Sequence, residues 1–275
     1  GEETPLRVYY GNVNAYPQSS FHSTFTTDPD APDDTGLLAE WHLDSRRGNW
    51  MYDDTDGAHD GLLWNFTWGE GDGGGWASRR DVAFTGGSHL IFNGESSYVE
   101  MPYDQGLSPA DAFSIEFWVQ WSGPKGQVDE QQLLHKGRAY GFAVGNGGIV
   151  QGHLLYHFLD PAAPDAWTSS GIVLEPNVWS HVALTWDGYT VKLFEDGKLI
   201  RTEPFIGQPG VGAGDRLMLG AGGTVASPTA YFFGKLDEIK MYERTLHPLE
   251  VKAHAYRHQY VLPSATLSVS GEDAL

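Results

Sequence analysis

The sequence predicts an all-β protein, a sandwich of antiparallel strands, and three observations support this fold class. In HVALTW (181–186) apolar side chains alternate with the others, and the alternation resumes over 191–194. An Asp-Gly pair follows each run, at 187–188 and 196–197, and such pairs favour the positive φ angles of tight hairpins. The 35 Gly and ten Trp suit short strands joined by tight turns. Because a period of two gives each strand one buried face, residues 178–200 are predicted to form an antiparallel meander.

Further strands are predicted along the chain wherever a short apolar run ends at a glycine- or proline-containing turn. They are LLAEWHLD (37–44), LLWNFTW (62–68), 90–92, 98–101, 113–121, LLHKG (133–137), YGFAVG (140–145) and HLLYHFLD (153–160). The run GEGDGGGW (69–76) is predicted to be a surface loop, because so many glycines forfeit packing and cost backbone entropy. Near the end, HPLEVKAHAYRHQ (247–259) changes to a helical pattern, with Pro248 in the first turn and Leu249 and Ala253 on one face.

Composition narrows the classes of partner. The chain of 275 residues has 36 acidic and 17 basic side chains, a formal charge of −19, which argues against nucleic acid and against anionic membrane surfaces. It contains no apolar run of about 18 residues, so membrane insertion is not expected. There is no cysteine, which fits an exported protein and equally permits a cytosolic one.

Three ordered motifs carry a family resemblance. They are FSIEFWVQW (113–121), WSHVALTWDG (179–188) and GKLDEIKMYERTLHPLEV (234–251). Together they resemble the LamG-like, concanavalin A-like lectin-glucanase modules over residues 37–256. The resemblance implies a concanavalin A-like antiparallel β-sandwich, a jelly roll, here with one short C-terminal helix.

The chain is expected to divide into three parts. Residues 1–35 read as an N-terminal strand followed by a Pro/Asp-rich linker, 36–256 as the jelly-roll domain and 257–275 as a tail. The segment Tyr9–Ala15 resembles the closing strand of a small domain of unknown function that precedes such modules in bacterial surface proteins. The chain would then be a piece of a longer polypeptide; the alternative is an extra strand at the sandwich edge.

An acidic turn suggests a calcium site. DDTDGAHDG (53–61) gathers carboxylates and two glycines, and calcium prefers six to eight oxygen ligands, although the spacing is not that of the twelve-residue helix-loop-helix site. The resemblance implies a structural calcium held by Asp53 and Asp237, with Asp44 as a third ligand. The alternative is that these are solvated turn carboxylates.

Catalytic patterns are not found. A retaining jelly-roll glucanase would carry two carboxylates in an E-x-D-x-x-E strand, and that pattern does not occur. Glu116 stands alone on a core-like strand, and the adjacent Asp237 and Glu238 should point to opposite faces. His153 and His157 share a strand face but lie about 13 Å apart, which is too far for one metal. His181 is expected to make a structural hydrogen bond.

The remaining expectation is recognition. Sugar-binding sandwiches lay an aromatic ring on the apolar face of a sugar, and Trp76 and Trp167 lie in predicted loops where a core would not need them. We therefore expect an extracellular or cell-surface module that binds glycan or other surface proteins. One alternative is an assembly subunit whose terminal strands, Leu6–Tyr10 and Thr266–Ser270, pair with other chains. A glycan-active lyase or hydrolase is the third reading.

Overall fold

The computed structural model describes residues 34–45, 48–67, 75–77, 88–104, 106–108, 111–137, 139–158, 167–205 and 215–257. All of them belong to the second of the two units into which the chain divides, Asp34–Leu275. The predicted terminal strands, Leu6–Tyr10 and Thr266–Ser270, lie outside the described residues, as does most of the predicted linker.

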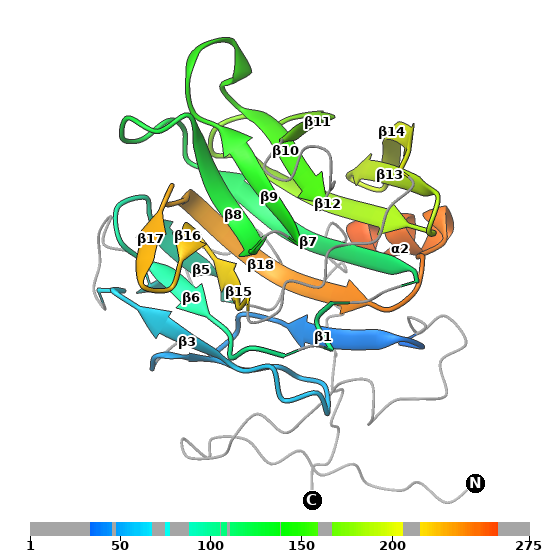
Figure 1. The fold of residues 1–275 in the computed structure, drawn as a ribbon, viewed down its shortest axis with the longest axis horizontal. Coiled ribbons are helices and arrows are strands. Elements are labelled where there is room, and N and C mark those ends of the chain that lie inside the picture. The colour runs from blue at the N-terminus through cyan, green and yellow to red at the C-terminus, as the bar shows by residue number, and fades with distance from the viewer. Residues whose placement is uncertain are drawn as a thin grey trace, which may run out of the picture. The chain divides into compact units, whose positions relative to one another are not determined.

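Two eight-stranded antiparallel sheets form a sandwich, which confirms the predicted fold class (Figure 1). Sheet A has the order β14(Lys198–Pro204)-β13(Thr190–Glu195)-β12(Trp179–Trp186)-β7(Phe113–Trp121)-β18(Phe233–Tyr242)-β5(Leu90–Asn93)-β4(Gly75–Trp76), and β1(Leu37–Trp41) also pairs with β18. Sheet B has the order β11(Thr168–Val173)-β10(His153–Phe158)-β9(Tyr140–Gly145)-β8(Glu130–Lys136)-β15(Leu217–Leu219)-β6(Tyr98–Glu100)-β3(Gly61–Trp64)-β2(Trp50–Met51). A hairpin of β16(Gly222–Thr224) and β17(Ser227–Thr229), the short 3-10 helix η1(Gly148–Val150) and the helix α2(Pro248–Arg257) complete the described elements.

Alternation along the strands places the core between the sheets. On β7 the odd-numbered apolar residues from Phe113 to Trp121 are buried in the main core, and on β12 Val182, Leu184 and Trp186 join them. Across the interface the ring of Phe117 meets that of Phe142 on β9 edge-on, with centroids 5.1 Å apart. The period-two pattern in the sequence therefore predicted the inner face of sheet A correctly.

The two Asp-Gly turns form as the sequence predicted. Asp196 and Gly197 both have positive φ, 48° and 72°, which a two-residue hairpin needs for its twist to match that of the strands. The carboxylate of Asp196 also accepts a hydrogen bond from the backbone N–H of His181 at 2.9 Å. The side chain thus links the turn to the neighbouring strand β12.

Helix α2 covers the outer face of sheet A. Leu246 and Val251 pack with Ala183, Phe194 and Tyr242 in a second apolar cluster. The short C-terminal helix was predicted, but the face that carries Leu249 and Ala253 is the exposed one. Among the described residues no helix is long and apolar enough to cross a membrane.

Chain order and strand order differ at one place in each sheet. In sheet A the late strand β18 lies between β7 and β5, and in sheet B the late strand β15 lies between β8 and β6. Within the described residues, the strands β1 to β6 pair with those of β7 to β14 only through these two late strands.

Candidate functional site

The outer face of sheet B carries a continuous row of side chains across seven neighbouring strands. Each residue of this cross-strand row pairs directly with the next. The row consists of His157, Gly141, His135, Met218, Glu100, Leu62 and Trp50. With strands spaced about 4.8 Å apart, the six steps from β10 to β2 span about 29 Å.

Alternation explains why these residues face outward. Their chain neighbours Tyr156, Phe142, Leu217, Val99 and Met51 all belong to the core between the sheets. In a strand, successive side chains point to opposite faces, so the row lies on the side away from the core. On β8 a bulge between Gln132 and Leu134 shifts the register, and His135 faces outward beyond it.

Aromatic rings lie at both ends of the row. At one end the ring of Trp167 meets that of His157 edge-on at 4.8 Å, and His157 lies 6.0 Å from the ring of His135. At the other end Trp50 and Trp64 are 42% and 41% exposed. Trp64 follows the row residue Leu62 by two positions, so it shares the face of Trp50. Exposed rings on a sheet face are surfaces on which an apolar ligand face can stack.

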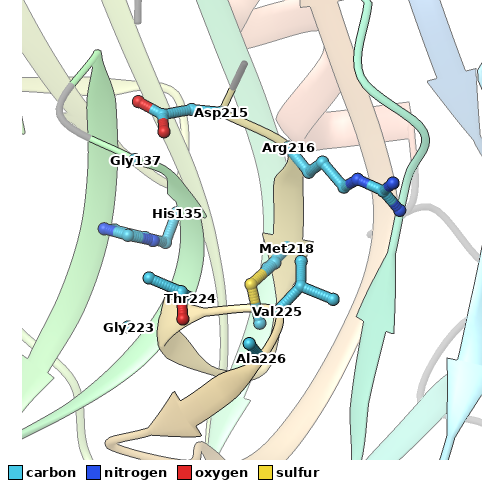
Figure 2. Close-up of a pocket in the computed structure, with 9 residues that line it drawn as sticks. All are labelled: His135, Gly137, Asp215, Arg216, Met218, Gly223, Thr224, Val225 and Ala226. Atoms are coloured by element: carbon cyan, nitrogen blue, oxygen red, sulfur yellow. The ribbon is translucent and has the colours of Figure 1, made fainter.

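A pocket of about 320 Å³ lies on the middle of the row (Figure 2). Asp215 and Arg216, just before β15, line one edge, and the turn of the β16–β17 hairpin lines the opposite edge. His135 and Met218 lie between them. The pocket is lined by His135, Gly137, Asp215, Arg216, Met218, Gly223, Thr224, Val225 and Ala226. The pocket combines an apolar floor with a hydroxyl, a carboxylate and an imidazole, while the Arg216 guanidinium points away from these groups and pairs with Glu100.

Charges on this face are largely balanced. Arg216 forms an ion pair with Glu100, which is buried beneath it. Burial lowers the pKa of His135, against the opposing effect of the Asp215 carboxylate. On the core side of the same strand, burial also lowers the pKa of Lys136, although the negative charges of Asp215 and Asp104 act in the opposite direction. At neutral pH His135 is therefore a neutral imidazole, with one nitrogen that donates and one that accepts a hydrogen bond.

The structure places the two tryptophans expected from the sequence in different settings. Trp167 lies at one end of the cross-strand row. Trp76 lies in β4 at the edge of sheet A, half-buried against the core, and its Nε1 donates to the carbonyl of Gly48 at 2.9 Å. Trp50, Trp64 and the pocket residues were not singled out from the sequence, because their strands are far apart in the chain and only the strand pairing brings them together.

Asp53 is the centre of the acidic turn. Its two carboxylate oxygens accept hydrogen bonds from the backbone N–H groups of Glu40, Thr55 and His59, from the Thr55 hydroxyl and from His59 Nδ1. Burial alone would raise the pKa of Asp53, but these hydrogen bonds lower it overall. Asp53 therefore holds the turn together through donors on several sides.

The other two expected calcium ligands, Asp44 and Asp237, lie close enough together for their charges to interact. Burial, together with the negative charges of Glu238 and Asp44, raises the pKa of Asp237 well above its usual range. Asp237 accepts a hydrogen bond from the N–H of Glu238 at 3.0 Å, and Asp44 accepts one from the N–H of Ser88. A bulge in β18 begins at Asp237, and Glu238 and Leu43 both have positive φ. Two bends in the backbone thus bring the two carboxylates to one place.

A neighbouring group of acids is neutralised by side-chain cations. His42 Nδ1 lies 2.7 Å from Glu238, and His42 Nε2 lies 3.3 Å from Glu40. Lys240 Nζ lies 2.5 Å from Glu40. Burial lowers the pKa of His42, but Glu238 and Glu40 outweigh it and raise this pKa to about 9. His42 is therefore an imidazolium at neutral pH.

Comparison with known proteins identifies the fold family. Residues 93–252, more than half of the chain, match the family model Laminin_G_3, described as the concanavalin A-like lectin/glucanases superfamily. A search of curated proteins gave no match.

Solved structures of similar fold include several binding domains. Domain 4 of AbnA, an extracellular GH43 arabinanase from Geobacillus stearothermophilus, in complex with arabinotriose, matches with a TM-score of 0.56 and 20% identity over 80% of this chain and 98% of that domain. The binding domain of Paraclostridial Mosquitocidal Protein 1 matches with a TM-score of 0.59 and 16% identity over 81% of this chain. Botulinum neurotoxin type C, whose cell entry depends on two ganglioside molecules, matches with a TM-score of 0.55 and 13% identity over 82% of this chain.

The extent of these matches differs. The chain spans nearly the whole arabinanase domain but only about half, 52%, of each of the two toxin chains. At such low identities the likeness concerns the fold. The family model, the two-sheet sandwich and these neighbours agree: the chain belongs to the concanavalin A-like lectin/glucanase superfamily.

Proposed function

We propose that this chain is a non-catalytic glycan-binding module and that the outer face of sheet B is its binding surface. The observation that carries the proposal is the pocket of about 320 Å³ on the cross-strand row. The fold family and the neighbouring structures, among them a domain in complex with arabinotriose, support the same function.

The pocket residues suit a ligand rich in hydroxyl groups. A sugar presents hydroxyls that both donate and accept, together with an apolar ring face. In the pocket Asp215 can accept hydrogen bonds, and Thr224 and the neutral His135 can both donate and accept them. Met218 supplies an apolar floor for the ring face. One small site thus offers partners both for the hydroxyl groups of a sugar and for its apolar ring face.

The test is a glycan array followed by calorimetry with pocket variants. We expect wild type to bind at least one neutral glycan and Asp215→Asn to weaken that binding, because the amide replaces an acceptor with a partial donor. The matched control is Tyr189→Ala, since Tyr189 is an aromatic residue 72% exposed on the opposite sheet, beside the Asp187-Gly188 turn. Equal loss in both variants, or no loss in Asp215→Asn, would contradict the proposed site.

We also propose a structural calcium at Asp44 and Asp237. Calcium takes oxygen ligands from carboxylates and backbone carbonyls, and a cation would offset the burial and the charges of Glu238 and Asp44 that disfavour the ionised form of Asp237. The donor set fits this ion, because both ligands are hard oxygens. Asp53, the other ligand expected from the sequence, has its oxygens surrounded by hydrogen-bond donors, so in this proposal it shapes the turn beside the site.

We propose an extracellular or cell-surface setting for the module. The formal charge of −19 supports this setting, because a large net charge keeps an exposed protein soluble. Detecting the protein in washed-cell and culture-medium fractions, against a cytosolic marker, tests this setting.

A further inference from the structure

The cross-strand row continues well beyond the pocket on both sides. From His135 it passes over Gly141 to His157, against which Trp167 packs. From Met218 it passes over Glu100 and Leu62 to the exposed Trp50. A ligand the size of one or two sugars would occupy the pocket and leave both aromatic ends uncovered.

We propose that this face binds an extended, neutral glycan chain that lies across the strands, from Trp167 over the pocket to Trp50. The proposal rests on the proposed glycan binding and adds the length, the direction and the charge of the ligand. It is carried by the register of the row and by the placement of aromatic and polar groups along it.

Length follows from the strand spacing. The row spans about 29 Å, and a sugar in an extended chain advances by about one strand spacing, so about six sugar units cover it. Gly141 leaves room for the His157 ring: a Cβ there would lie 2.8 Å from Nε2 of His157 and 3.0 Å from the carbonyl of Leu134. The His157 ring therefore lies over Gly141, and the two histidine rings, with centroids 6.0 Å apart, form this part of the row.

Charge on the face favours a neutral chain. Arg216, whose side chain is 48% exposed, is paired with the carboxylate of Glu100. Lys136 is buried and donates to the hydroxyl of Ser108 at 2.7 Å, so it offers no surface charge to an anionic sugar. Asp215 adds a negative charge at the pocket edge, within a protein of formal charge −19. A chain of uronic acids would be repelled along most of this path.

The polar groups of the pocket and the aromatic rings at the two ends of the row have different consequences for binding. Hydrogen bonds in the pocket depend on the identity of the sugar, whereas stacking on Trp50 or Trp167 depends chiefly on the chain reaching that ring. The pocket should therefore select the sugar, and the aromatic ends should select for length.

Calorimetry with oligosaccharide ladders tests this division. The probes are cello-, xylo-, manno- and arabino-oligosaccharides from dimers to octamers, titrated into wild type, Trp50→Ala and the control Tyr189→Ala. For the ladder that binds, we expect affinity to rise up to about the hexamer and then to level off. Trp50→Ala should weaken hexamer binding by up to about tenfold and leave the dimer unchanged, while Tyr189→Ala changes neither.

The outcomes separate this inference from the proposed function. If no oligomer of any ladder binds, glycan binding at this face is contradicted and the inference falls with it. If the dimer binds as tightly as the hexamer, or if Trp50→Ala weakens both equally, glycan binding stands and the extended site is wrong. Tighter binding of oligogalacturonates than of any neutral ladder would contradict the charge assignment.

Discussion

His254 Nδ1 lies 2.7 Å from Glu116 Oε1, so the helix α2 is joined to the strand β7 by a buried pair. On the other side His181 Nε2 lies 3.6 Å from Glu116 Oε2. All three side chains are buried between the helix and the outer face of sheet A. Burial by itself would raise the pKa of Glu116, but the two imidazoles outweigh it and hold this pKa well below its usual range.

The first prediction concerns acid unfolding. A carboxyl whose pKa is lower in the folded than in the unfolded state stabilises the fold above its unfolded pKa of about 4.3, and this stability is lost as the pH falls toward the folded value. Urea unfolding of wild type between neutral pH and about pH 2.5 should show a steep loss of stability below about pH 4.3. Glu116→Gln should be less stable at neutral pH, with a shallower loss in acid. Parallel curves would contradict this role.

The second prediction concerns the other partner of the pair. His254→Ala leaves the buried carboxylate of Glu116 without its close hydrogen-bond donor, and removing one partner of a buried pair costs about 3 kcal/mol. We expect a correspondingly lower free energy of unfolding at neutral pH. Lys252→Ala, at an exposed position of the same helix, is the control and should stay within about 0.5 kcal/mol of wild type.

The third prediction is a stabilising effect of calcium. An ion that binds only the folded state at one hundred times its Kd adds about 2.7 kcal/mol, which for a domain of this size raises Tm by several degrees. Thermal unfolding in calcium and in excess chelator should differ by that amount. Identical melting curves in the two conditions would refute the proposed ion.

The stability difference between Asp237→Asn and wild type should change sign between chelator and calcium. In chelator, we expect the variant to be at least as stable as wild type, because it removes a carboxyl group whose ionised form is disfavoured by burial and by the charges of Glu238 and Asp44. In calcium, the wild type should become the more stable of the two. A calcium shift that survives in Asp237→Asn would keep the metal but remove Asp237 from its ligands.

The fourth prediction contrasts the two tryptophans that the sequence suggested. Trp167→Ala should weaken binding of long neutral glycans with little change in Tm, because the ring lies at the end of the cross-strand row. Trp76→Ala should lower Tm and leave affinity unchanged, because that ring packs on the core and its Nε1 is bonded to Gly48. The reverse pattern in calorimetry and thermal melts would move the site to β4.

Local pattern was enough to predict most of the fold. The alternation in 181–186, the Asp196-Gly197 turn and the terminal helix all depend on neighbours within a few residues, and all three are present. Alternation also tells which residues share a face of one strand. It does not tell which strands become neighbours, because pairing depends on contacts across the whole chain.

The candidate site was harder to predict for that reason. Trp50 lies in a strand of two residues, too short for any alternation to be recognised, and His135 faces outward only beyond a bulge. The acidic turn drew attention to Asp53, since a sequence shows carboxylates but not the N–H groups that satisfy them. Trp167 could be proposed from the sequence because an aromatic residue in a polar loop is conspicuous without knowledge of the fold, and its role in binding stays a prediction.

The position of the two late strands has a consequence for how the chain is made. Synthesis runs from the N-terminus at about 5–20 residues per second, so β1 to β14 leave the ribosome before β15 and β18 exist. Until then, among the strands that the structure describes, none joins the early strands to the middle ones, and the facing edges of β5, β6, β7 and β8 are unpaired. Sheet B cannot be joined before β15 ends at Leu219, nor sheet A before β18 ends at Tyr242, and the long loops that must then be closed make folding slow. During that interval the nascent chain exposes unpaired strand edges, which favour aggregation.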